Sequence, residues 1–314
     1  MRLRLITLLV ALAAAVAAAG CGALPDEGTQ GAEAAEGKLR AVTTTNWITD
    51  TAEQIGGDRV AVTGLMGAGV DPHLYNASAG DVDTLRETDV AFWNGLDLEA
   101  QMEDVFETIG EEKPVVAVGE AIPQERLLAF AGKSDEPDPH VWFSPNRWKA
   151  VAAAMARTYK EADPEGAATY EANLEAFLAE LDEVDAYARE RFAQIPEKSR
   201  VLVTSHDAFG YFGDEYGFDV VAIQGISTQD EATPGDIERV ARTIAERDLD
   251  AVFVESSVPR RTIEAVIAAA AQQGQPVEIG GELFGDNAGD RGSPGGTYIG
   301  ALRQNIDLIA DGLS

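Results

Sequence analysis

Residues 164–195, PEGAATYEANLEAFLAELDEVDAYARERFAQI, form the longest uninterrupted helical pattern in the chain. After Gly166 this segment contains neither glycine nor proline. Its apolar residues recur every three or four positions, as on one face of an α-helix; they are Tyr170, Leu174, Phe177, Leu178, Leu181, Val184, Tyr187, Phe192 and Ile195. About thirty residues at 1.5 Å each predict a helix of roughly 45 Å, long enough to run the height of a protein of this size. The alternative is a helical hairpin broken near Asn173.

On both sides of this segment, short apolar runs alternate with helical patterns. The runs that predict strands are 39–44, 59–65, 90–93 and 114–118 before it, and 200–204, 219–223, 251–255 and 277–279 after it. Strands alternating with helices indicate parallel sheets covered by helices. We therefore predict an α/β fold with two lobes, each a mostly parallel sheet flanked by helices, joined by one long rigid helix. The expected boundaries are 38–160 for the N-terminal lobe, 161–197 for the connecting helix and 198–314 for the C-terminal lobe.

The first 37 residues carry targeting information. Two arginines precede an uncharged apolar run at 5–19, which is too short to span a bilayer comfortably and has the size of a signal-peptide core. The following Ala-Ala-Gly-Cys at 18–21 resembles the bacterial lipoprotein signal, which implies removal of residues 1–20 and lipidation of Cys21. A simple secreted protein cleaved nearby is the alternative. The remainder of 21–37 is rich in Gly, Ala and Glu and predicts a flexible tether. Lipidation implies a place at the outer face of the cytoplasmic membrane, or in the periplasm.

Composition narrows the range of partners. The formal net charge is −30, so nucleic acid and anionic membrane surfaces would be repelled. Cys21 is the only cysteine, which excludes an intrachain disulfide.

All three histidines of the chain occur in loop-like contexts. Two share the frame Asp-Pro-His, at 71–73 and 138–140, and the third lies in Ser-His-Asp at 205–207. His73, His140 and His206 each follow a predicted strand, and ligands of open α/β sheets bind at the carboxyl ends of strands. Convergence of three imidazoles there would suit a transition metal. A fourth ligand is expected from the loop after the last strand, whose spacing leaves Glu282, Asp286 and Asp290 open.

Four segments together resemble a known family: VDPHLY at 70–75, DPHVW at 138–142, TSHDAFGYF at 204–212 and GELFGD at 281–286. The chain is similar, from about residue 38 to its end, to the metal-binding lipoproteins of bacterial zinc and manganese ABC importers (cluster A-I; ZnuA-, PsaA- and TroA-like substrate-binding proteins). The resemblance implies the ligand set His73, His140, His206 and Asp286. Many manganese-type members have Glu at the third position, and many zinc-type members have a His-rich loop before the second. The pattern here is closest to the TroA-like branch with three His and one Asp.

The resemblance implies capture and delivery of a divalent metal rather than catalysis. The expected cargo is zinc or manganese, with iron less favoured, and three imidazoles favour zinc by intrinsic affinity. The expected partners are an ABC permease and its ATPase, together with the membrane through the lipid on Cys21, and the protein is expected to be a monomer. Two alternatives stay open. A secreted zinc hydrolase would need an open coordination position and a general base, and the chain has no His-Glu-x-x-His motif. An adhesin-type surface protein would hold its metal as a purely structural element.

Overall fold

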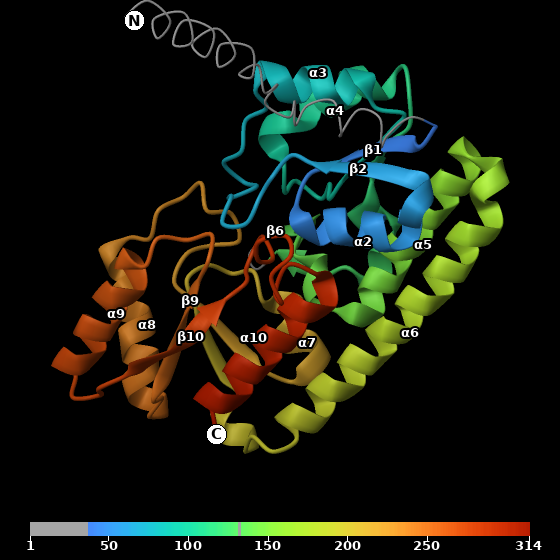
Figure 1. Cartoon of the computed structure of the whole chain (residues 1–314). Helices are drawn as coiled ribbons and strands as arrows, with labels where there is room; N and C mark the ends of the chain where they lie inside the picture. The colour runs from blue at the N-terminus through green and yellow to red at the C-terminus, as the bar shows by residue number, and fades with distance from the viewer. Residues whose placement is uncertain (1–36, 131–132) are drawn as a thin grey trace, which may run out of the picture. The chain divides into compact units, whose positions relative to one another are not determined.

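A computed structural model of the protein describes residues 37–130 and 133–314 (Figure 1). The predicted signal peptide, Cys21 and the tether lie outside the described residues. Lys38–Ser314 forms one compact unit. In that part of the chain, no helix combines the length and the apolar character needed to cross a membrane.

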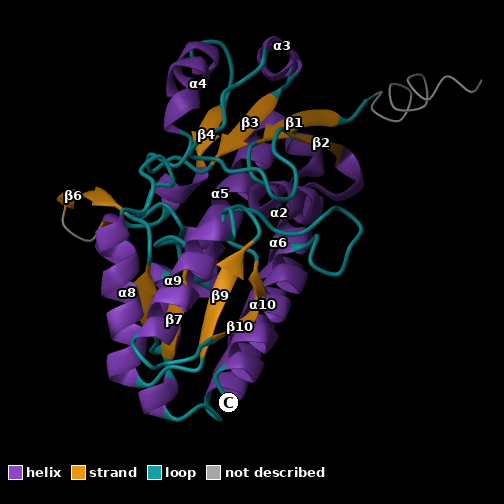
Figure 2. Ribbon diagram, turned by 90° about the vertical axis from the view of Figure 1, so that its left-hand side faces the viewer, coloured by secondary structure: helices purple, strands orange, loops and turns teal. Residues whose placement is uncertain are grey.

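The N-terminal half, residues 38–162, is built on a four-stranded parallel sheet in the order β2-β1-β3-β4. Its strands are β1 (Leu39–Thr43), β2 (Val60–Gly64), β3 (Val90–Trp93) and β4 (Val115–Ala117). Its helices are α2 (Asn46–Gly56), α3 (Ala79–Glu87), α4 (Glu103–Gly110) and α5 (Pro145–Ala162). Figure 2 shows α3 and α4 on one face of the sheet and α2 and α5 on the other. The central strands β1 and β3 are largely buried, as a sheet covered on both faces requires.

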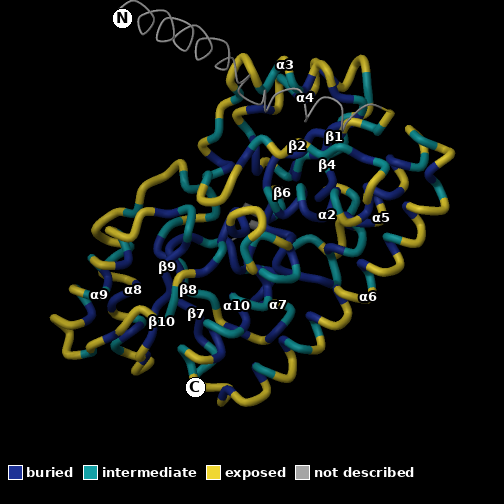
Figure 3. The backbone as a smooth tube through the Cα atoms, in the orientation of Figure 1, coloured by how far each residue is buried: buried dark blue, intermediate teal, exposed yellow. Residues whose placement is uncertain are grey.

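The C-terminal half, residues 197–314, contains two parallel strand pairs that lie side by side, because β7 also contacts β9. The strands are β7 (Val201–Thr204), β8 (Asp219–Ala222), β9 (Ala251–Glu255) and β10 (Glu278–Leu283). The helices are α7 (Gly210–Tyr216), α8 (Pro234–Arg247), α9 (Arg261–Gln272) and α10 (Tyr298–Gly312). Strands β7 and β9 are buried along their whole length, so this pair forms the centre of the half (Figure 3).

The predicted long helix is α6 (Ala167–Phe192), and it runs without a break through Asn173. It packs against α2 and α5 of the N-terminal half and against α7 and α10 of the C-terminal half (Figure 1). Its buried face consists of Tyr170, Leu174, Phe177, Leu181, Val184, Ala188 and Phe192, and these residues belong to a core cluster with members from both halves. The predicted α/β fold with parallel sheets and one long connecting helix is confirmed, and the hairpin alternative is wrong.

Local signals account for the helix boundaries. Ser78 caps α3 and Thr233 caps α8, each through a reciprocal capping box with an aspartate three residues later. Ser144 caps α5 and is followed by Pro145, whose missing N–H costs nothing in the first turn. Asp163 accepts the N–H of Gly166 and holds Arg59 at 2.8 Å, which fixes the entry to α6.

Three details differ from the sequence prediction. Strand β10 continues to Leu283, because the pairing with β9 resumes after an irregularity between Ile279 and Gly281; Glu282 therefore lies in a strand and not in a loop. The long polar stretch before His140 contains a small antiparallel pair, β5 (Ala129–Phe130) and β6 (Lys133–Pro137). The sequence also predicts one helix over residues 98–109, whereas the structure has a 3-10 turn followed by α4. Short 3-10 helices lie at Gly57–Arg59, Ala100–Met102, Val118–Ala121, Gln124–Arg126, Val141–Phe143, Pro164–Gly166 and Glu197–Ser199.

Candidate metal centre

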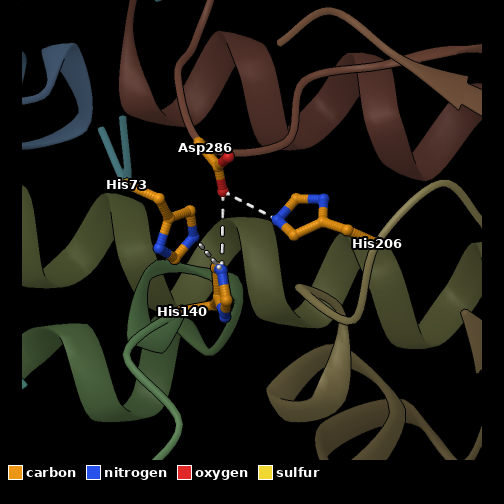
Figure 4. A group of neighbouring side chains, drawn as sticks. All are labelled: His73, His140, His206 and Asp286. Atoms are coloured by element: carbon orange, nitrogen blue, oxygen red, sulfur yellow. Dashed lines mark hydrogen bonds and ion pairs between the residues drawn. The ribbon is translucent and has the colours of Figure 1, made fainter. Parts of the chain in front are cut away.

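His73, His140, His206 and Asp286 meet between the two halves (Figure 4). Each offers one potential ligand atom, and these atoms all lie within 4.8 Å of one another. The Nε2 atoms of His73 and His140 are 3.4 Å apart, and Asp286 Oδ1 lies 3.1 Å from His206 Nε2 and 3.5 Å from His140 Nε2. All four residues are buried. Among the described residues, this is the one group of His, Cys, Asp and Glu side chains with metal-site geometry.

The two Asp-Pro-His frames form the same local turn. Asp71 Oδ1 accepts the backbone N–H of His73, and Asp138 Oδ1 accepts that of His140, both at 2.9 Å. An aspartate that accepts an N–H two residues ahead fixes a tight turn, and the intervening proline sets φ. Each frame thereby orients its histidine, which explains why the chain uses the tripeptide twice.

Beyond this shared turn the two aspartates have different roles. Asp138 Oδ1 also lies 2.7 Å from His140 Nδ1, so this carboxylate holds the ring and turns Nε2 toward the other histidines. Asp71 instead accepts a hydrogen bond from Thr228 Oγ1 at 2.6 Å, which links the His73 turn to the C-terminal half. A carboxylate behind an imidazole fixes its tautomer and increases its basicity as a ligand.

Glu255, the last residue of β9, does for His206 what Asp138 does for His140. Its Oε1 accepts the backbone N–H groups of Ser205 and His206 at 2.8 and 3.0 Å, and its Oε2 lies 2.6 Å from His206 Nδ1. A Cβ on Gly285 would lie 2.6 Å from Glu255 Oε2. The glycine at 285 therefore leaves room for the carboxylate behind His206.

The charges of the centre follow from these contacts. Burial opposes a charged imidazole, but Asp138 and Asp286 outweigh it and raise the pKa of His140 to about 9. Asp286 and Glu255 likewise overcome burial and raise the pKa of His206 well above its usual value. The pKa of Asp286 is held well below its usual range, because His206 and His140 outweigh its burial. His73 has no such carboxylate behind it, and burial lowers its pKa to about 3.

Aromatic packing closes the centre from behind. The His140 ring lies 5.2 Å from the Trp142 indole at an interplanar angle of 72°, and the Trp142 side chain is fully buried. Phe143 stacks on Phe209 at 4.3 Å, which joins the segment after His140 to the segment after His206.

The three candidate carboxylates of the last loop end in different places. Asp286 points toward the histidines and is buried, whereas Glu282 and Asp290 are exposed, with Glu282 paired to Arg260. No role for Asp138 or Glu255 is predicted from the sequence. The position of Asp138, two residues before a histidine, was a usable signal, whereas nothing in the sequence pairs Glu255 with His206.

Three imidazole nitrogens and one carboxylate oxygen form a donor set suited to zinc and to neighbouring divalent transition metals. Four protein ligands fill a tetrahedral shell, so such a set binds an ion without presenting an activated water.

Comparison with known proteins agrees with this chemistry. The manganese-binding lipoprotein MntA of Bacillus subtilis is 44% identical over 302 residues, 96% of this chain and 97% of MntA. The zinc-binding protein TroA of Treponema pallidum is 43% identical over 281 residues, 90% of this chain and 91% of TroA. The iron ABC transporter lipoprotein MtsA of Streptococcus pyogenes serotype M1 is 32% identical over 283 residues, 88% of this chain and 89% of MtsA.

The fold matches as well. A solved structure of the periplasmic zinc-binding protein TroA superposes with a TM-score of 0.87 at 43% identity, covering 88% of this chain and all of the TroA chain. The family model described as zinc-uptake complex component A, periplasmic (ZnuA), matches residues 41–312. The chain therefore belongs to the ZnuA family of metal-binding proteins.

Proposed function

We propose that this protein is the substrate-binding lipoprotein of an ABC importer, which captures a divalent transition metal between its halves and passes it to a membrane permease. The observation that carries the proposal is the buried convergence of three histidines and one aspartate from the segments that follow β2, β6, β7 and β10. Family membership and relatives named for manganese, zinc and iron support the same reading.

In this proposal His73, His140, His206 and Asp286 are the ligands, and the cargo is zinc or manganese. The relatives named for manganese and for zinc are almost equally similar, at 44% and 43% identity, so identity does not choose between the two ions. Three imidazoles bind zinc more tightly than manganese by intrinsic affinity. Metal supply outside the cell then determines which ion is loaded.

The mechanism is capture between two lobes, 38–160 and 198–314, joined by the connecting segment 161–197. The ion enters, displaces water and is enclosed by ligands from both lobes. Because α6 packs against helices of both halves, the shift that releases the ion is small. Docking on the permease supplies that shift, and the ATPase drives the transport cycle.

We propose no catalysis at this centre. A zinc hydrolase needs an open coordination position and a general base beside it. Here the two carboxylates nearest the histidines apart from Asp286, those of Asp138 and Glu255, are engaged by the Nδ1 atoms of His140 and His206. Neither relatives nor geometry supports the hydrolase or the structural-metal adhesin.

Localisation at the outer face of the membrane, through a lipid on Cys21, is part of the proposal, as is a monomeric state. Cys21→Ala is expected to move the protein from the membrane fraction to the soluble extracytoplasmic fraction, because a protein without its acyl chains loses stable anchoring. Retention of the variant in membranes would remove the lipid-anchor claim.

The decisive experiment measures the melting temperature of the metal-stripped body, residues 38–314, against added zinc and manganese. An ion that binds only the folded state stabilises it by RT ln(1 + [L]/Kd), about 2.7 kcal/mol at a hundred times Kd. The midpoint is expected to rise in the parent and to stay unchanged in His140→Ala, which removes one ligand. A stripped protein that is already unfolded would instead indicate a structural metal. A folded one that responds to neither ion would refute the carrier function.

A further inference from the structure

Asp286 belongs to the C-terminal half by sequence, yet the loop that carries it is held by the N-terminal half. Resting on the function proposed above, we propose that Asn46, Trp47 and Trp142 are positioning residues for Asp286. They fix its loop to the half that carries His73 and His140. Three of the four ligands then form one preassembled group, and His206 approaches from the other half.

Between Phe284 and Gly285, the hydrogen-bond partners of the loop change from the C-terminal half to the N-terminal half. Both backbone polar groups of Phe284 are bound by the Asn305 amide of α10, at 2.9 and 2.8 Å, so this residue is tied to the C-terminal half. One residue later, the Gly285 carbonyl accepts the indole N–H of Trp47 at 3.2 Å and that of Trp142 at 3.1 Å. Both indoles belong to the N-terminal half and are fully buried.

Beyond Asp286, Asn46 binds the next three residues. Its backbone N–H donates to Asn287 Oδ1 at 2.9 Å, and its side-chain Oδ1 accepts the N–H of Ala288 at 2.6 Å. Its Nδ2 donates to the carbonyls of Ala288 and Gly289 at 2.8 and 3.1 Å. Asn46 is the first residue of α2, so its backbone N–H is free of any intrahelical partner and available to the loop.

Asn287 strengthens the attachment in the opposite direction. Its side-chain Nδ2 donates to the carbonyl of Val70, three residues before His73. The Asp286 loop is therefore hydrogen-bonded directly to the segment that leads into another ligand. From the C-terminal half, Ser257 Oγ lies 3.4 Å from Asp286 Oδ2, and His206 Nε2 lies 3.1 Å from Asp286 Oδ1.

His206 is supported in the opposite way. Its backbone N–H and Nδ1 are held by Glu255 of β9, and its carbonyl accepts from Thr204 of β7. Both partners lie in the C-terminal half. If the halves separate slightly, these bonds keep His206 with one half while the bonds of Asn46 and the two indoles keep Asp286 with the other.

The test is a double-mutant cycle between Asn46 and Asp286, read as affinity for Zn²⁺ by chelator competition and as the visible spectrum of bound Co²⁺. Asn46→Ala removes the three side-chain bonds to the loop and is expected to weaken Zn²⁺ binding about 10- to 100-fold, the range for partners that orient a ligand. It should also change the Co²⁺ spectrum, because a misplaced carboxylate alters the coordination geometry. In the Asp286→Asn background, Asn46→Ala should have no further effect, since the residue acts through Asp286.

Asn173→Ala is the matched control, because Asn173 also binds a backbone carbonyl, that of Ile55, but lies away from the loop. It should leave the affinity for Zn²⁺ and the Co²⁺ spectrum unchanged.

Should Asn46→Ala fail to fold, Asn46→Asp keeps the shape of the side chain and the acceptor oxygen while removing the two N–H donors, and the same losses are expected. Equal losses in the parent and Asp286→Asn backgrounds, or an unchanged affinity and spectrum in Asn46→Ala, would overturn the positioning role alone. If Asp286→Asn itself binds Zn²⁺ like the parent, the proposed ligand set fails, and this inference fails with it.

Discussion

Loading the centre with a divalent metal at pH 7 should release about two protons. In the metal-free protein, the pKa of His140 is raised to about 9 and that of His206 lies well above its usual value. Both imidazoles are therefore charged at neutral pH, whereas His73, with a pKa of about 3, is neutral. A metal ligand must be an unprotonated nitrogen. The ion consequently displaces one proton from each of two histidines and none from Asp286, whose pKa is held well below its usual range.

The magnitude follows from this count. Each displaced proton changes the binding constant tenfold per pH unit, so affinity should fall about 100-fold for each unit of acidification between about pH 6.5 and pH 5, where both His140 and His206 are protonated in the metal-free protein. The affinity must fall on acidification, because protons compete with the metal for the imidazole nitrogens. Two protons and one divalent ion also carry the same charge. The exchange therefore leaves the total charge of this buried cluster unchanged, which limits the electrostatic cost of emptying it.

Calorimetric titration with Zn²⁺ in two weakly coordinating buffers of different ionisation enthalpy measures the released protons directly. We expect a value near two for the parent and a value closer to one for Asp138→Asn, which loses the carboxylate that raises the pKa of His140. Asp290→Asn is the control and should match the parent, since Asp290 is exposed and outside the cluster. A parent value near zero would show that the histidines are already neutral and would refute the reasoning.

Further perturbations test other parts of the structure. Glu255→Gln should weaken Zn²⁺ binding about 10- to 100-fold, because it removes the carboxylate that orients His206, and chelator competition measures the loss. A loss below twofold would show that the ring is held by packing alone. Leu181→Ala, at a fully buried position of α6, should lower the free energy of unfolding in urea by about 2–5 kcal/mol with no change in metal stoichiometry. Asp290→Asn should keep the parent's affinity for Zn²⁺, and a large loss would mean that Asp286 is not the carboxylate ligand.

The architecture was predictable because it depends on periodicity. The helical spacing of residues 164–195 and the alternation of strands and helices are local patterns, and the absence of glycine and proline after Gly166 favoured one long helix over a hairpin. The predictions that were wrong concern segments in which pairing between distant strands overrides the local sequence pattern. Strand β10 continues through Gly280 and Gly281, residues that read as a turn, because it pairs with β9. Strand β5 of the β5–β6 pair has two residues, which is too short to show an alternating pattern in the sequence.

The three histidines of the candidate site could be predicted from the sequence, because each follows a predicted strand and the carboxyl ends of parallel strands lie at one edge of a sheet. His73 follows β2, His206 follows β7, and His140 follows β4 after the β5–β6 pair, so the fold brings the three segments together. The choice of Asp286 came from family resemblance, because Glu282 and Asp290 lie only four residues away on either side. The network behind the ligands was not predictable. Glu255 and His206 are 49 positions apart, and only the neighbouring course of β7 and β9 brings them together.

The placement of the Trp142 indole 5.2 Å from the His140 ring has an optical consequence. An excited indole can transfer an electron to a charged imidazole beside it, and this process quenches its emission. A neutral imidazole bound to zinc, which has no accessible redox states, offers no such route, whereas a paramagnetic ion such as Mn²⁺ quenches by its own mechanism. The intrinsic tryptophan fluorescence of the unlabelled protein should therefore distinguish the protonated, the zinc-loaded and the manganese-loaded forms, and so follow loading and release in real time.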